Sequence, residues 1–412
     1  MKLFDCHCHF HLGPRGLAPL LQNLPPPPYA PPILSSAESS PSPSSLLLHD
    51  GQRSSTPLSA TSTSDQKISF SFAGAAIMST HPRDYAQVDA CVSTLQKQSY
   101  LAVPCYGIHP WFLHEVIALD EVLVGGNDNG SNSGVIEGEG NKDDDWLTEL
   151  RQRLIDHPNA IVGEIGLDGA RWRAAPGDDN DGSNTHNPDN NAAWKYQKRM
   201  LSCPMNLQRR AFEQQLVVAT ELNRPVSIHV VQSWGQLLDS LSNVRELMRQ
   251  KYERIGDGIC DDDVIDDTAD HIVDEQYSSI RRKKKKQSKN RLLLPPKIYF
   301  HAFSGKAGVL PSLLAAIEKG NVSRNDVYFG FAPAIPNFYS SKTPSIMKQI
   351  GIHNLLLETD LEDSTTAWDD LNEGIQGIAA ALDMDVCEVA NQTHDNAMRF
   401  YFEREAEIIS SQ

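Results

Sequence analysis

The chain has 412 residues, of which 40% are hydrophobic, and a formal net charge of -16. This length allows two average domains or one large α/β barrel with insertions, and the acidic balance argues against tight nonspecific binding of nucleic acid through a broad basic face. No apolar run approaches the roughly 20 residues of a membrane-spanning helix, and no signal peptide is evident, so a cytoplasmic or nuclear protein without membrane association is expected.

The chain opens with an apolar strand that leads into two histidines. Leu3–Phe4 predict a short buried strand, and His7 and His9 follow it two positions apart. Residues two apart in an extended chain point to the same side, so both imidazoles are expected to face one point beyond the strand's end. Cys6 and Cys8 are expected on the opposite side as small packed residues. A His-x-His pair alone is also compatible with ordinary polar residues after a strand.

Four segments have the composition of long, low-complexity loop insertions. Runs of Pro and Ser, or blocks of like charge, do not bury enough apolar surface to order a chain. Disordered insertions are therefore expected at about residues 23–66, 125–145, 169–191 and 252–290. The last one ends in the basic run Arg281–Lys286, which fits a nuclear-import signal and a solvated charge block equally well.

Between these insertions, apolar strands alternate with helical patterns. After the first strand, the expected strands lie at residues 73–80, 101–110, 160–168, 225–230, 297–301, 327–331 and 355–360. The expected helices lie at about residues 84–98, 146–155, 206–222, 234–248, 368–382 and 386–401. Continuous apolar strands are typical of parallel sheets whose two faces are both covered. Without the insertions roughly 280 residues remain, so residues 1–412 are predicted to form a single (β/α)8 TIM barrel with long insertions.

Most of these strands lead into a residue with a metal-binding side chain. In a (β/α)8 barrel the carboxyl ends of the strands form the active face, and polar residues there are expected to be catalytic. The candidates are His7, His9, His109, Glu164, His229, His301 and Asp360. Imidazole and carboxylate without thiolate suit zinc, manganese, iron or magnesium. One catalytic ion typically uses three protein ligands, so the set predicts two ions, with Glu164 placed to bridge them.

As a set, the motifs around these residues resemble the TatD family of metal-dependent deoxyribonucleases, within the amidohydrolase-like barrels. They are Asp5–His9, Gly107–Pro110, Gly163–Asp168, Ile228–His229, His301–Gly305 and Leu357–Asp360, with Asn396 and Phe400 in the last helix. The resemblance implies two divalent ions, Mg, Mn or Zn, that share Glu164. One site would be completed by His7, His9 and Asp360. The other would be completed by His229 and His301.

The same resemblance implies catalytic roles. Asp360 would accept the proton of the attacking water, and His109 would contact or orient a phosphate of the substrate rather than bind metal. The family usually has a small residue and Pro soon after the Thr-Asp pair, whereas this chain continues with Leu361–Asp363. That departure concerns substrate contacts beside the last strand and leaves the metal ligands intact.

Three functions remain open from the sequence. The first is a deoxyribonuclease that hydrolyses DNA phosphodiester bonds with a water activated by two metal ions. The second is a metal-dependent hydrolase of another ester, such as aminoacyl-tRNA, because related barrels use the same ions for carbonyl chemistry. The third is a scaffold whose insertions bind a protein partner. The intact ligand set favours an enzyme, but fold alone does not identify the substrate.

Overall fold

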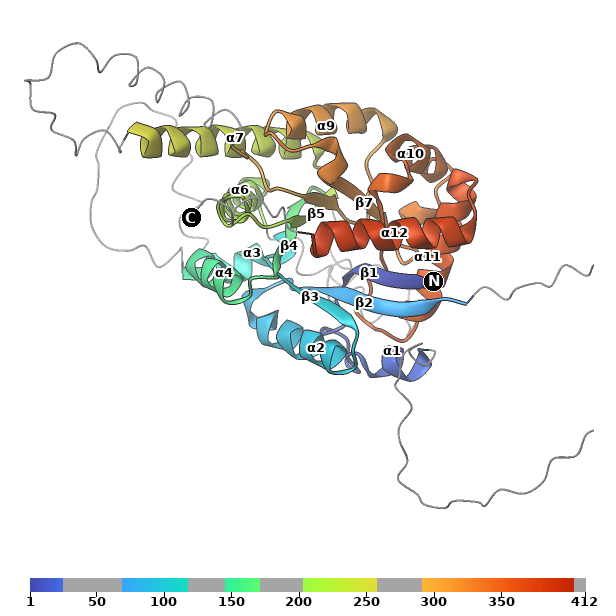
Figure 1. The fold of residues 1–412 in the computed structure, drawn as a ribbon. Helices are drawn as coiled ribbons and strands as arrows, with labels where there is room; N and C mark the ends of the chain where they lie inside the picture. The colour runs from blue at the N-terminus through green and yellow to red at the C-terminus, as the bar shows by residue number, and fades with distance from the viewer. Residues whose placement is uncertain (25–68, 118–144, 171–202, 258–290, 404–412) are drawn as a thin grey trace, which may run out of the picture.

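The computed structural model describes residues 1–24, 69–117, 145–170, 203–257 and 291–403, and within them eight parallel strands form one sheet in chain order (Figure 1). The strands are β1 (Lys2–Cys8), β2 (Ser71–Met78), β3 (Leu101–Tyr106), β4 (Ile161–Asp168), β5 (Val226–Val231), β6 (Ile298–Phe300), β7 (Val327–Phe331) and β8 (Leu355–Leu357). The Asp360 N–H donates to the His7 carbonyl and the His9 N–H donates to the Leu361 carbonyl, both at 2.8 Å. These bonds join the segment after β8 to β1, so the sheet closes and the predicted (β/α)8 barrel is confirmed.

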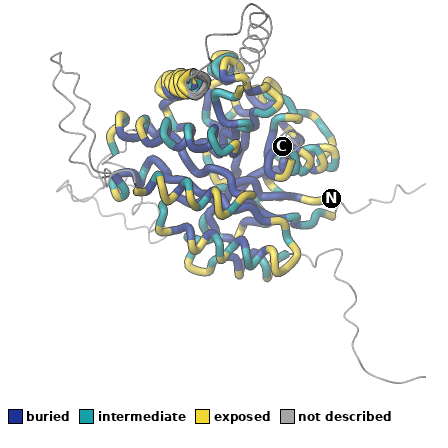
Figure 2. Tube along the Cα trace, turned by 60° about the vertical axis from the view of Figure 1, so that its left-hand side comes forward, coloured by how far each residue is buried: buried dark blue, intermediate teal, exposed yellow. Residues whose placement is uncertain are grey.

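Helices surround the barrel, and the helix residues that face solvent are coloured as exposed in Figure 2. They are α1 (Ala18–Asn23), α2 (Tyr85–Lys97), α3 (Leu113–Val116), α4 (Asp145–Asp156), α6 (Met205–Glu221), α7 (Trp234–Asp257), α9 (Leu310–Glu318), α10 (Thr343–Ile350), α11 (Ala367–Leu382) and α12 (Val386–Tyr401). The six helices expected from the sequence are all present. Among the described residues, no helix is long and apolar enough to cross a membrane.

Helix α7 is longer than its sequence pattern predicted. It ends at Asp257, not at residue 248, so the expected insertion at 252–290 begins inside a helix. Leu241, Val244 and Met248 are fully buried, and Tyr252 extends the same stripe with the Arg291 guanidinium 5.0 Å from its ring. The apolar stripe thus continues at helical spacing beneath charged neighbours, which the acidic composition obscured.

Most of each predicted insertion lies outside the described residues. This holds for residues 25–66, 125–144, 171–191 and 258–290, which include the basic run Arg281–Lys286. The single-domain organisation and the role of these segments therefore stay predictions.

The last helix closes the barrel at the end where the strands begin. Phe400 and Tyr401 of α12 pack into the inner cluster of buried residues, which includes Phe4 and Tyr299. The Asn396 side-chain amide donates to two carbonyls at the start of β8, at 2.7 and 2.8 Å. Because α12 fills this end, the opposite end, where the strands finish, is left for the polar side chains.

The two cysteines of the first strand do not share a face. Cys6 packs in the inner cluster, whereas Cys8 packs in the outer cluster between the strands and the helices. The pairing of β1 with β2 shifts register between Asp5 and Cys8, which breaks the strict alternation of side chains. The expectation that both cysteines lie opposite the histidines is therefore wrong for a physical reason, although both are buried and small as expected.

Truncating Phe400 should destabilise the whole barrel. Its ring is 1% exposed and lies 5.7 Å from the Tyr299 ring and 5.4 Å from the Tyr328 ring. Phe400→Ala leaves a cavity at the closed end, so we expect the free energy of unfolding to fall by about 3–5 kcal/mol, as measured by urea denaturation. Phe402→Ala is the matched control, because that ring is 41% exposed. Equal losses in the two variants would show that α12 does not close the core.

Candidate metal centre

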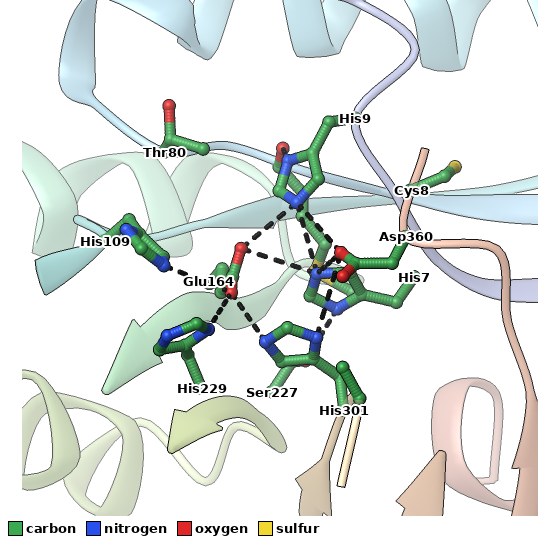
Figure 3. A network of polar contacts seen from close by, with 12 residues as sticks. His7, Cys8, His9, Thr80, His109, Glu164, Ser227, His229, His301 and Asp360 are labelled. Atoms are coloured by element: carbon green, nitrogen blue, oxygen red, sulfur yellow. Dashed lines mark hydrogen bonds and ion pairs between the residues drawn. The ribbon is translucent and has the colours of Figure 1, made fainter. Parts of the chain in front are cut away.

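A single carboxylate, Glu164 of β4, lies at the centre of the polar side chains (Figure 3). Its Oε1 lies 2.5 Å from Nε2 of His301, 3.1 Å from Nδ1 of His229 and 3.4 Å from Nε2 of His109. The carboxylate is 4% exposed, so water screens these contacts little. One oxygen of Glu164 therefore faces three imidazoles from three different parts of the barrel.

The other oxygen of Glu164 faces the two histidines of the first strand. Oε2 lies 3.1 Å from Nε2 of His9 and 3.4 Å from Nε2 of His7, and these two ring nitrogens are 3.2 Å apart. Oδ1 of Asp360 lies 3.6 Å from the same His7 nitrogen and 3.7 Å from that of His9. Glu164 thus lies between two groups of donors, as the sequence analysis expected of a bridging carboxylate.

The barrel brings all seven predicted residues together. His301 and Asp360 follow β6 and β8, His109 precedes the short 3-10 helix Pro110–Phe112 that follows β3, and Glu164 lies within β4 rather than at its end. Asp360 has φ 60°, a left-handed conformation that Asp tolerates, and its N–H bond to the His7 carbonyl holds that turn.

Glycines beside Glu164 allow close contact between neighbouring strands. A Cβ on Gly166, which has φ +155°, would lie 1.9 Å from the His229 carbonyl oxygen, and a Cβ on Gly163 would lie 2.9 Å from the Ser227 Cβ. Only glycine lets β5 approach β4 this closely. The approach carries His229 to Glu164.

Hydrogen bonds on the far side of the rings orient three histidines. His7 Nδ1 lies 3.1 Å from the Ser227 hydroxyl, and His9 Nδ1 lies 2.9 Å from the Met78 carbonyl. His229 Nε2 lies 3.2 Å from Oδ2 of Asp168. Such outer partners fix the orientation and basicity of metal-binding imidazoles.

Sequence reasoning assigned no role to Asp168 or Ser227, although both carried a signal. Asp168 lies four residues after Glu164 on β4, so strand alternation places the two on the same side of that strand. Ser227 lies two residues before His229 on β5, so these two also share a side. Trp111, whose indole N–H donates to Asp168 at 2.8 Å, had no comparable signal.

Two further buried carboxylates support the site without facing it. Asp5 accepts hydrogen bonds from the Thr359 hydroxyl at 2.7 Å and the Thr359 N–H at 3.1 Å, and burial raises its pKa to about 7. Glu358 accepts from the Tyr299 hydroxyl and from the Ala302 N–H, and burial raises its pKa well above the usual range. These bonds join the ends of β1, β6 and β8 on either side of Asp360.

In the loop after β8, residues that depart from the family pattern contact the segment after β1. The Asp363 carboxylate accepts from the Arg15 guanidinium at 2.9 Å, and a Cβ on Gly13 would lie 2.4 Å from the Glu362 carbonyl oxygen. This loop therefore packs on the segment after β1, at the edge of the centre.

The electrostatics of the centre favour positive charge. Burial alone would raise the pKa of Glu164, but the imidazoles, led by His301, hold it well below its usual range. Burial lowers the pKa of His9 and His229, yet the hydrogen bonds and charges of nearby carboxylates outweigh burial and raise the two values to about 9 and about 10. For His7 and His109 burial dominates, and their pKa values are lowered.

These contacts fit a bound cation. The neutral ring of His9 must donate from Nδ1 to the Met78 carbonyl, which leaves a lone pair on Nε2 facing the Glu164 carboxylate at 3.1 Å. Nδ1 of His301 is buried and lacks a hydrogen-bond partner within the described part of the chain, and its Nε2 lies 2.5 Å from Oε1 of Glu164. Converging acceptors in a buried site are unfavourable unless a proton or a metal ion lies between them. Nitrogen and carboxylate donors of this kind suit divalent ions such as zinc and manganese.

Three overlapping groups of donor atoms lie close enough to hold an ion, with all atoms in a group within 4.8 Å of one another. They are His7 with His301 and Asp360, His7 with His9 and Glu164, and Glu164 with His109 and His229. The first joins His301, which the resemblance assigned to the second ion, with two residues assigned to the first ion, whereas the second contains only residues assigned to the first ion. The third contains His109, which was predicted to contact substrate instead.

One family model and several known proteins are similar to this chain. A family model described as TatD related DNase matches residues 59–402. The Cut9-interacting protein scn1 of Schizosaccharomyces pombe is 25% identical over 311 residues, which cover 69% of this chain and 78% of that protein. A TatD homologue from Escherichia coli K12 is 16% identical over 81% of this chain and 88% of that chain, with a TM-score of 0.45. A TatD family hydrolase from Entamoeba histolytica is 14% identical over 81% and 85% of the two chains, with a TM-score of 0.44.

Proposed function

This chain belongs to the TatD related DNase family, and from that premise we propose that it is a divalent-metal-dependent hydrolase that cuts DNA phosphodiester bonds. The observation that carries the proposal is the buried Glu164, whose two oxygens face separate groups of imidazoles. The residues would hold two divalent ions, Mg, Mn or Zn, with Glu164 as a ligand of both. His7, His9 and Asp360 would hold one ion, and His229 and His301 would hold the other.

The bound ions, Asp360 and His109 would have different roles in the reaction. When bound, the ions supply a water of lowered pKa and neutralise charge on the phosphoryl group. Asp360, with 15% of its side chain exposed, is the carboxylate placed to take the proton of that water. Without an ion, burial and the nearby charge of Glu164 raise the pKa of Asp360, although the adjacent imidazoles oppose them. His109 contacts the phosphate.

Substrate comparison tests this proposal directly. Purified full-length protein is stripped with chelator, reloaded with Mg, Mn or Zn, and incubated with DNA, RNA and aminoacyl-tRNA. We expect DNA cleavage that requires added metal and stops on chelation. Faster hydrolysis of aminoacyl-tRNA than of DNA would replace the nuclease with the alternative ester hydrolase. Metal-independent cleavage would reject both.

A second candidate function is protein binding on the same barrel. It is favoured by the fission-yeast relative, which is named as a Cut9-interacting protein. A groove of about 630 Å³ on the outer helices, lined by Leu147 of α4, Val217 of α6 and Met248 of α7, offers one surface, and the predicted insertions offer others. A cytoplasmic or nuclear location is proposed for either function. Stable pull-down of the protein that corresponds to Cut9 by an Asp360→Asn variant would support this role independently of catalysis.

A further inference from the structure

Trp111 donates two hydrogen bonds toward the metal centre from two different N–H groups. Its backbone N–H donates to Nδ1 of His109 at 3.2 Å. Its indole N–H donates to Oδ2 of Asp168 at 2.8 Å. Trp111 lies in the 3-10 helix Pro110–Phe112, so one residue after β3 contacts partners on β4 and on its own loop.

The first bond determines which nitrogen of His109 carries hydrogen. A neutral imidazole has one donor and one acceptor nitrogen. Because Nδ1 accepts from the Trp111 backbone, Nε2 carries the hydrogen, and it points at Oε1 of Glu164 from 3.4 Å. A nitrogen that carries hydrogen cannot bind a metal. His109 therefore acts as a hydrogen-bond donor in the centre, although its position would also suit a ligand.

The second bond orients the Asp168 carboxylate, and that carboxylate has the opposite consequence for His229. Oδ2 of Asp168 accepts from the Trp111 indole and lies 3.2 Å from Nε2 of His229, while Oδ1 accepts from the Ala170 N–H at 2.8 Å. A carboxylate only accepts, so Nε2 of His229 carries hydrogen and Nδ1 keeps its lone pair. That lone pair faces Oε1 of Glu164 at 3.1 Å. His229 is thus left free to bind an ion through Nδ1.

We propose that Trp111 is a positioning residue that gives two adjacent histidines opposite roles. The rings of His109 and His229 lie 4.5 Å apart at 71°, and both approach the same Glu164 oxygen. Through its backbone, Trp111 makes His109 a hydrogen-bond donor within the centre rather than a metal ligand. By orienting Asp168, it helps to keep Nδ1 of His229 available to a metal. The proposal rests on the metal-dependent hydrolase proposed above.

Nitrogen-15 NMR of the histidine rings tests the assignment in zinc-loaded, full-length protein. We expect a neutral His109 ring with hydrogen on Nε2, and a His229 ring with hydrogen on Nε2 and zinc on Nδ1. Resonances are assigned with His109→Gln and His229→Gln variants. A His109 ring bound to zinc, or a His229 ring bound through Nε2, would overturn the proposal. Failure of the wild-type protein to take up zinc would instead reject the proposed metal site itself.

Variants separate the two bonds of Trp111. Trp111→Phe removes the indole N–H and keeps the backbone N–H, so the His109 spectrum should persist while zinc affinity falls by less than the roughly 10–100-fold typical of losing a direct partner of a metal ligand, because Trp111 acts through Asp168. In Asp168→Asn, zinc affinity should fall by roughly 10–100-fold. In this variant, either the Trp111 or the Ala170 N–H donor would face an amide NH2 group instead of a carboxylate oxygen. Trp368→Phe, in the first turn of α11, is the control for loss of an indole and should bind zinc as wild type does. Wild-type zinc affinity in Trp111→Phe would contradict the proposal.

Discussion

Replacing Asp360 with Asn should lower the turnover of phosphodiester hydrolysis by about 10²–10⁴-fold, the range expected when a general base is removed. The carboxylate lies 3.6 and 3.7 Å from the ring nitrogens of His7 and His9, a position that fits the role of ligand and proton acceptor proposed for it. The amide of Asn keeps the shape but neither accepts a proton nor balances the charge of an ion. Steady-state kinetics on a DNA substrate with saturating metal measure the loss.

The stability of the same variant should change little. The turn at Asp360 is held by its backbone N–H, which donates to the His7 carbonyl and is unaffected by the substitution. Asp363→Asn is the matched control, because that carboxylate lies in the same loop, pairs with Arg15 at 2.9 Å and is 44% exposed. Full activity in Asp360→Asn, with folding and metal content unchanged, would remove Asp360 from the proposed mechanism.

Replacing Glu164 with Gln should remove metal as well as activity. Glu164 is the only residue of the described centre whose side chain lies within 3.4 Å of all five imidazoles, so neutralising it weakens both donor groups at once. We expect metal affinity to fall by more than the roughly 10–100-fold that loss of an outer partner costs. Elemental analysis after gel filtration, together with the DNA assay, measures both effects.

The control for this variant is Glu149→Gln on the exposed face of α4, which should keep the metal and the activity of the wild type. Circular dichroism of Glu164→Gln distinguishes metal loss from unfolding. If Glu164→Gln retained wild-type metal content and turnover, Glu164 would not be the shared ligand of a two-ion hydrolase.

The sequence predicted the secondary structure well where the signal was local. Strand β7 is a continuous apolar run, and helices α6 and α12 have buried apolar residues at helical spacing, so these elements were predicted within a few residues, whereas α9 was not predicted. The end of α7 was predicted too early, because acidic residues near Asp257 outweighed the buried stripe that ends at Tyr252. The prediction that Cys6 and Cys8 both lie opposite the histidines was wrong for a different reason. A register shift in β1 depends on its pairing with β2, which no single strand specifies.

The sequence by itself determined the barrel and the set of ligand-type residues, because each depends on a short apolar run followed by a polar side chain. It did not determine how two histidines of the centre differ. His109 and His229 are both plausible ligands by residue type, and the hydrogen bonds that distinguish them come from the Trp111 backbone and from Asp168. The bond between Trp111 and Asp168 joins residues 57 positions apart. Tertiary structure decides such contacts because the pairing of β4 with both β3 and β5, rather than any local pattern, brings the ends of these three strands side by side.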